Sequence, residues 1–106
     1  MDSGKRLARL EKMLEADPND AFCLYSIGFE HAREDRHEEA IGWYERAMAA
    51  DGSYHYAWFQ KAKSLIALHR EDDARTTLRD GLERAEAAGD TKATSELREL
   101  LSVLGG

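Results

Sequence analysis

The chain has 106 residues and a formal net charge of -6, with one proline and one cysteine. This length allows one small domain. The chain contains only 19 Leu, Ile, Val and Phe residues, which is few for a packed core. Ala, Glu, Lys, Leu and Arg make up about half of the chain, as in helical proteins, while eight β-branched residues are too few for a sheet. We therefore predict an all-α fold and exclude all-β and α/β folds.

The first predicted helix covers 3–16, because apolar side chains recur there at helical spacing. Those on one face are Leu7, Leu10, Met13 and Leu14. The turn at 17–20 contains the only proline and ends this helix, and Asn19 or Asp20 is the candidate N-cap of the next one.

Two helical hairpins follow in the middle of the chain. Their predicted helices cover 20–34, 37–50, 54–68 and 71–87. An acidic pair opens the second helix of each hairpin, Glu38 with Glu39 and Asp72 with Asp73. Carboxylates at these positions complement the positive end of the helix dipole, so we interpret the pairs as helix starts rather than as catalytic acids.

The last predicted helix covers 91–104, after a stop at Gly89 and a cap at Asp90 or Thr91. Its apolar stripe consists of Ala93, Leu97, Leu100, Leu101 and Leu104. A terminal helix needs a polar outer face. We assign that face to Lys92, Ser95, Glu96, Arg98 and Glu99.

The sequence repeats itself with an offset of 34 residues. In the first unit the matching positions are Leu24, Gly28, Ala40, Tyr44 and Ala47. In the second unit they are Trp58, Ala62, Ala74, Leu78 and Gly81. Small residues at such spacing let helix backbones approach closely while the large ones fill the flanking gaps. The chain thus holds two full repeats preceded by half of one.

This pattern of large and small residues resembles the tetratricopeptide repeat, and the resemblance covers roughly residues 5–86. Three positions depart from the family pattern: Gly52 replaces a turn proline, His31 an aromatic residue and Lys61 an aliphatic one. The resemblance implies a right-handed solenoid of antiparallel helix pairs in a small bacterial member of the family. Its parts within the single domain 1–106 would be a half-repeat helix over 3–16, units over 20–53 and 54–87, and a capping helix over 91–104.

In this family the first helices of successive repeats line a concave groove that binds peptides or protein segments. The resemblance places Phe22, Tyr25, Phe29, Ala32, Arg33, Tyr56, Phe59, Lys63, Ile66 and Ala67 on that groove. Members that grip the terminal carboxylate of chaperone tails carry Lys and Asn where this chain has Tyr25 and Phe29, so we do not expect that clamp. We expect a non-catalytic module whose aromatic groove prefers apolar ligand side chains, with Arg33 and Lys63 steering acidic segments toward it.

Two alternatives to a free groove remain open. The last helix or a second subunit could cover the aromatic residues as part of a core. The chain could also form a structural homodimer that buries either the groove or the apolar stripe of the first helix.

No catalytic, metal or cofactor site is predicted. The four histidines lack a recognised ligand spacing. Cys23 and His31 project from one short helix without a third orienting group, so Cys23 is interpreted as a small buried side chain and His31 as a packed, hydrogen-bonded one.

The charge pattern and the apolar runs argue against two further kinds of partner. Basic residues alternate with acidic ones, which disfavours nucleic acid. No apolar run approaches the roughly 18 residues that span a bilayer. The N-terminus leads into an amphipathic segment rather than a signal sequence, so we expect a cytoplasmic protein without a membrane partner.

Overall fold

The computed structural model describes residues 2–106, and side chains from residue 4 onward; Met1 of the amphipathic N-terminal segment lies outside the described residues. Within this range six helices follow one another without a strand, which confirms the predicted all-α class. They are α1 (Asp2–Ala16), α2 (Ala21–Arg33), α3 (His37–Ala50), α4 (His55–Ala67), α5 (Glu71–Ala88) and α6 (Thr91–Val103). Each predicted helix differs from its observed counterpart by at most one residue at either end.

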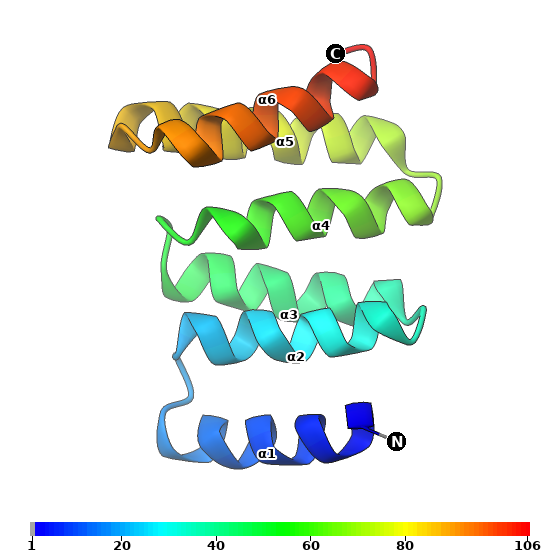
Figure 1. The fold of residues 1–106 in the computed structure, drawn as a ribbon, viewed down its shortest axis with the longest axis vertical. Coiled ribbons are helices and arrows are strands. Elements are labelled where there is room, and N and C mark those ends of the chain that lie inside the picture. Colours follow the sequence, from blue (N-terminus) through cyan, green and yellow to red (C-terminus); the bar gives the residue numbers. More distant parts are fainter. Residues whose placement is uncertain (1) are drawn as a thin grey trace.

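The helices stack along the longest dimension of the molecule, which measures 38 × 29 × 18 Å (Figure 1). Each helix packs against the next one in the chain, and α4 also contacts α2 and α6. Figure 1 shows α2, α4 and α6 in a near layer, with α3 and α5 behind them and α1 at the end that holds the N-terminus. We call α2, α4 and α6 the inner layer.

Glycines allow the two layers to approach closely. A Cβ at Gly28 would lie 2.8 Å from Cε1 of Tyr44, and one at Gly81 would lie 2.9 Å from Cβ of Trp58. Both large residues are buried, so their side chains fill the space that a longer side chain on the facing helix would need. The small number of large aliphatic residues is therefore compatible with a packed core.

The helix ends follow from local side-chain chemistry. Asp20, not Asn19, caps α2 and accepts a hydrogen bond from the backbone N–H of Cys23 at 3.1 Å. Gly89 ends α5 in the left-handed conformation, with φ of 72°, and Asp90 then caps α6. The acidic pairs lie in the first turns of α3 and α5, as predicted.

The two residues that the sequence assigned to packing, Cys23 and His31, differ in burial. Cys23 is fully buried, and its thiol donates a hydrogen bond to the carbonyl oxygen of Leu10 at 3.1 Å. Burial raises the pKa of the Cys23 thiol. His31 is half-buried, stacks on Trp43 and accepts a hydrogen bond from Arg36 at 3.0 Å.

Among the described helices, none is both long enough and apolar enough to cross a membrane.

Candidate functional site

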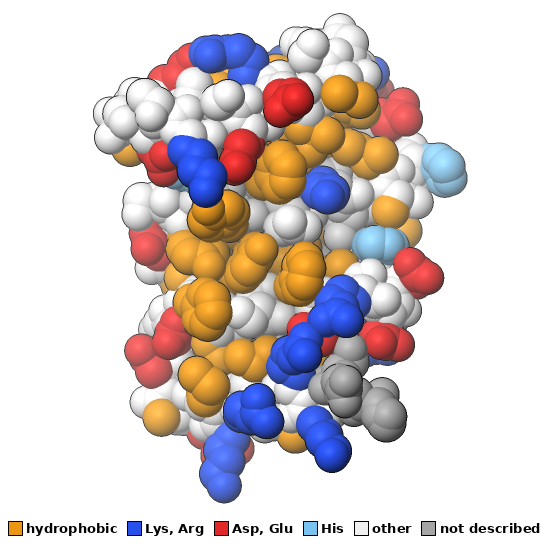
Figure 2. All heavy atoms as spheres, in the orientation of Figure 1, with side chains coloured by type: hydrophobic (Ala, Val, Ile, Leu, Met, Phe, Trp, Pro, Cys, Tyr) orange, Lys and Arg blue, Asp and Glu red, His pale blue; other side chains and the backbone are white. Residues whose placement is uncertain are grey.

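The predicted groove residues lie on the inner layer, at the surface. The first five belong to α2 and the other five to α4, and none of them is buried. Phe22, Phe29 and Tyr56 are 57%, 37% and 46% exposed. Figure 2 shows hydrophobic side chains, in orange, running as a band down the centre of this face. The last helix therefore leaves Phe22, Phe29 and Tyr56 exposed, whereas Tyr25 and Phe59 are half-buried and pack against the core.

Tyr25 is the centre of an aromatic cluster that joins α2, α3 and α4. Its ring centroid lies 5.4 Å from that of Tyr54, 5.9 Å from Tyr44, 6.2 Å from Phe29 and 6.4 Å from Tyr56. Burial raises the pKa of Tyr25 and raises that of Tyr54 to about 12. The cluster is a continuous aromatic surface in which four rings pack around Tyr25.

Two adjoining hollows open on this surface. The first, which we call the α2–α6 hollow, has a volume of about 430 Å³ and crosses the inner layer from α2 to α6. Its lining consists of Tyr25, Tyr56, Phe59, Gln60, Glu96, Glu99, Leu100 and Val103. Three predicted groove residues thus meet here, whereas Phe22, Phe29, Arg33, Lys63 and Ile66 lie outside this lining.

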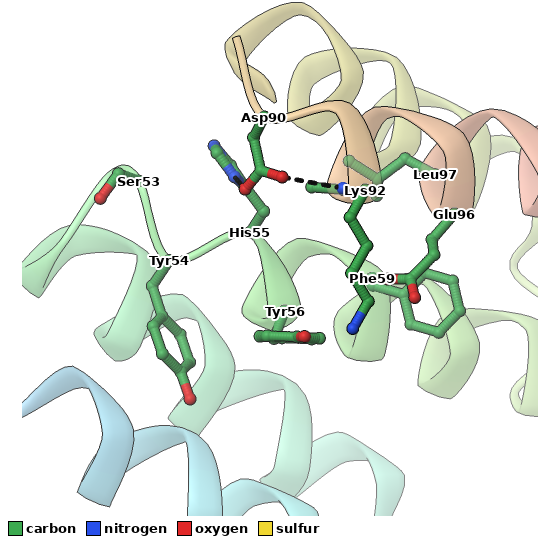
Figure 3. Close-up of a pocket in the computed structure, with 10 residues that line it drawn as sticks. Ser53, Tyr54, His55, Tyr56, Phe59, Asp90, Lys92, Glu96 and Leu97 are labelled. Carbon is green, nitrogen blue, oxygen red and sulfur yellow. Dashed lines mark hydrogen bonds and ion pairs between the residues drawn. The ribbon is translucent and has the colours of Figure 1, made fainter. Parts of the chain in front are cut away.

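The second hollow, which we call the His55 pocket, has a volume of about 230 Å³ and lies between the starts of α4 and α6 (Figure 3). It shares Tyr56, Phe59 and Glu96 with the first hollow. The rest of its lining consists of Ser53, Tyr54, His55, Asp90, Lys92, Ala93 and Leu97. In Figure 3 the side chains of Lys92 and Glu96 extend from α6 toward Tyr56 and Phe59.

Asp90 links the start of α6 to α4 through two hydrogen bonds. One carboxylate oxygen accepts the backbone N–H of Ala93 at 3.0 Å, and the other accepts the Nδ1–H of His55 at 3.2 Å. His55 is 6% exposed, and among the described residues its Nε2 has no hydrogen-bond partner. The hydrogen bonds from Ala93 and then His55 hold the pKa of Asp90 below its ordinary value. Asp90 therefore links a helix cap to the wall of the pocket.

Acidification is expected to remove the contribution of Asp90 to stability. Because its folded pKa is lowered, this contribution is complete above the unfolded pKa of about 3.9 and is lost as the pH falls through the folded pKa. Asp90→Asn keeps a capping side chain but removes the charge. Thermal melts should give the wild type the higher Tm at neutral pH, with the difference shrinking between about pH 5 and pH 2. A difference that stays constant over this range would contradict the assignment.

Three residues of the predicted polar outer face of α6, Lys92, Glu96 and Glu99, also border the groove; Lys92 and Glu99 are exposed and Glu96 is half-buried. Lys92 and Glu96 line the His55 pocket, and Glu96 and Glu99 line the α2–α6 hollow. The reason is the contact of α6 with α4, which makes α6 the third helix of the inner layer rather than a cover over its end. The groove therefore has an acidic wall that the sequence did not indicate.

The arrangement of these side chains is suited to binding a ligand. Aromatic rings, two hollows and charged side chains on stable helices can bind the side chains of a ligand. Within residues 2–106, no group of three or more His, Cys, Asp or Glu side chains is placed to hold a metal ion.

Comparison with known proteins identifies relatives of the same repeat type, although no family model matches the chain. A tetratricopeptide repeat domain protein from Salinibacter ruber is 31% identical, with a TM-score of 0.76 over 83% of this chain and 89% of that one. The TPR2B domain of yeast Sti1, solved as a complex with pHsp70, is 20% identical, with a TM-score of 0.90 over 98% of this chain and 83% of that one, and shows the fold alone.

A curated relative is anaphase-promoting complex subunit 3 of Schizosaccharomyces pombe, which is 34% identical over 68 residues. The match covers 64% of this chain but 10% of the subunit, so the chain spans about a tenth of that relative's length.

Proposed function

Because the chain belongs to the tetratricopeptide repeat family, we propose that it is a non-catalytic interaction module that binds a peptide or an extended protein segment across α2, α4 and α6. The observation that carries the proposal is the exposed aromatic band around Tyr25 and the two hollows beside it. An apolar band with a polar rim is typical of a protein-binding surface. The yeast Sti1 domain with the same fold is solved as a complex with pHsp70, which supports a ligand-binding role for this fold.

The mutual packing of the rings in the aromatic cluster favours binding of a ligand without much rearrangement. Tyr44 is fully buried beneath Tyr25, and Tyr54 holds Tyr25 from the side of α4. Since these rings are already ordered, a ligand loses little affinity to ordering them. Apolar or aromatic ligand side chains would enter the α2–α6 hollow and the His55 pocket.

Glutamate at two groove positions, the exposed Phe29 and the half-buried Phe59, is expected to weaken peptide binding by about thirtyfold or more, because losing a hot-spot aromatic residue costs about 2 kcal/mol or more. The probe is the strongest peptide selected from a random displayed library on the wild-type protein, then labelled and titrated by fluorescence anisotropy. The control, Ala49→Glu with Thr76→Glu, adds the same charges at exposed positions of α3 and α5. Equal affinity of wild type and groove variant, with helicity intact by circular dichroism, would refute the groove.

A homodimer is the competing proposal, and Met13 is the part of the α1 stripe that favours it, since Leu10 is buried and Leu7 and Leu14 pack against the cluster of Cys23 and Ile27. Met13 is 46% exposed, and among the described helices α1 packs against α2 alone. Light scattering at tens of micromolar separates the two proposals. A monomer contradicts the dimer, whereas a dimer that dissociates in the Phe29→Glu, Phe59→Glu variant would assign the groove to self-association.

A further inference from the structure

Charge is distributed unevenly along the groove. At the end near α1, the guanidinium groups of Arg6 and Arg33 both approach the buried Glu30, at 3.0 and 3.6 Å, and both side chains are about half exposed. Figure 2 shows Lys and Arg side chains, in blue, gathered toward this end of the face. At the opposite end, Glu96 and Glu99 of α6 line the hollows. The groove thus has a basic end and an acidic end with aromatic rings between them.

The acidic end has the composition of a site for a cation. Tyr56, Phe59 and Glu96 line both hollows, and Tyr54 joins them in the His55 pocket. Aromatic faces attract ammonium and guanidinium groups, and a carboxylate beside them adds a direct ion pair. A volume of about 230 Å³ accommodates one long side chain. Two ammonium groups of this chain compete with a ligand cation here, because Nζ of Lys63 lies 5.6 Å from the ring centroid of Phe59 and Lys92 lies at the rim of the pocket that Glu96 lines.

We propose that the groove selects an extended segment whose charges are segregated, with an acidic end over α1 and α2, apolar residues over Tyr25 and Phe59, and a basic end over α6. This inference rests on the proposed function and specifies its ligand. Neighbouring helices in a layer lie about 8–10 Å apart, so α2 and α6 are roughly 20 Å apart. A strand-like segment at about 3.3 Å per residue spans this distance with about six residues.

The test compares three labelled peptides of identical composition, each with two Asp, two Lys and five alternating Leu and Phe residues. One has the acidic pair at its N-terminus and the basic pair at its C-terminus, the second has the reverse order, and the third has one Asp and one Lys at each end. One of the two segregated peptides should bind at least about fivefold more tightly than the mixed one at low salt, since its end charges form complementary exposed pairs. Equal affinities for all three, or no binding, would overturn the inference.

Substitutions in α6 test whether Glu96, Glu99 and Lys92 cause the preference for one of the segregated peptides. Glu96→Gln with Glu99→Gln should lower the affinity of the preferred peptide about fivefold and bring it to that of the mixed peptide. Lys92→Gln should strengthen its binding, because a competing cation is removed. The control, Glu39→Gln with Glu83→Gln, removes two exposed carboxylates from α3 and α5 and should leave the affinity of the preferred peptide unchanged. Weaker binding by Lys92→Gln would instead place an acidic ligand group in the pocket and overturn the proposed orientation.

The proposed function and this inference fail in different ways. If the Phe29→Glu, Phe59→Glu variant loses affinity for all three peptides while the wild type shows no preference, the groove binds ligands but the charge assignment is wrong. If that variant binds both the selected peptide and the three charge-patterned peptides as tightly as the wild type does, the groove is not the binding site.

Discussion

Replacing Trp58 by alanine is expected to lower the free energy of unfolding by about 4 kcal/mol, within the range for losing a buried tryptophan. Trp58 is 2% exposed and lies between α4 and α5, where its Nε1–H donates a hydrogen bond to Asp80 at 2.8 Å. Truncation leaves a cavity against Gly81 and removes the donor from Asp80. Urea denaturation followed by circular dichroism measures the change.

Trp58→Phe provides the comparison, because it retains an aromatic ring and loses chiefly the hydrogen bond to Asp80. We expect it to cost much less than alanine, about 1–2 kcal/mol. If the alanine variant lost less than about 1 kcal/mol, the side chain would not be a central part of the core. If the alanine variant were unfolded without denaturant, the phenylalanine variant would still measure what the indole contributes beyond a phenyl ring, chiefly its hydrogen bond to Asp80.

Alanine at Gly28 is expected to destabilise the protein by about 3 kcal/mol, toward the upper end of the cost of overpacking. The new Cβ would lie 2.8 and 2.9 Å from two ring carbons of Tyr44 and 3.1 Å from the carbonyl oxygen of Ala40. The ring is fully buried and the carbonyl belongs to a helix backbone, so neither can move aside without shifting α2 from α3. A decrease in Tm and in the urea midpoint would report the loss.

Gly42→Ala is the matched control, since Gly42 is helical and a Cβ there meets nothing within 4 Å. There alanine only restricts the backbone and should stabilise the protein by up to about 1 kcal/mol. The same substitution should thus have opposite signs at the two glycines. Stabilisation at Gly28 as well would mean that α2 and α3 do not approach as closely as the structure places them.

The helices could be predicted from the sequence because their signals are local. Helical spacing of apolar residues, the caps at Asp20 and Asp90 and the stop at Gly89 each act within a few residues. The recurrence of small and large residues over 34 positions likewise predicted which helices approach closely. The surface position of the α2 and α4 aromatic residues agrees with the resemblance, while their role as a ligand site stays a prediction.

The orientation of α6 could not be predicted from the repeat because its spacing changes there. α5 has 18 residues where α3 has 14, and the first residue of α6, Thr91, comes 36 positions after the first residue of α4, His55. With that correction Glu96 corresponds to Gln60 and Glu99 to Lys63, which face the groove side of α4. An offset of 34 hides this match, so the acidic wall was missed.

The His55 pocket was missed for another reason. Its central hydrogen bond joins residues 35 positions apart, and a capping aspartate has a second oxygen whose partner depends on tertiary contact. The sequence predicted Asp90 as a cap candidate but gave His55 no role. The signal available was a histidine at the first position of one inner helix and an aspartate just before the next.

The walls of the groove come from α2, which pairs with α3, from α4, which pairs with α5, and from α6, which packs on α5 as the last helix. No isolated hairpin contains the whole proposed site, so a ligand of the groove would bind only when all three inner helices are docked. By mass action, a ligand at a hundred times its Kd would add about 2.7 kcal/mol to the stability of the docked stack over any partly separated form. Occupancy of the groove would therefore also hold the repeats together, and ligand concentration would set how often they come apart.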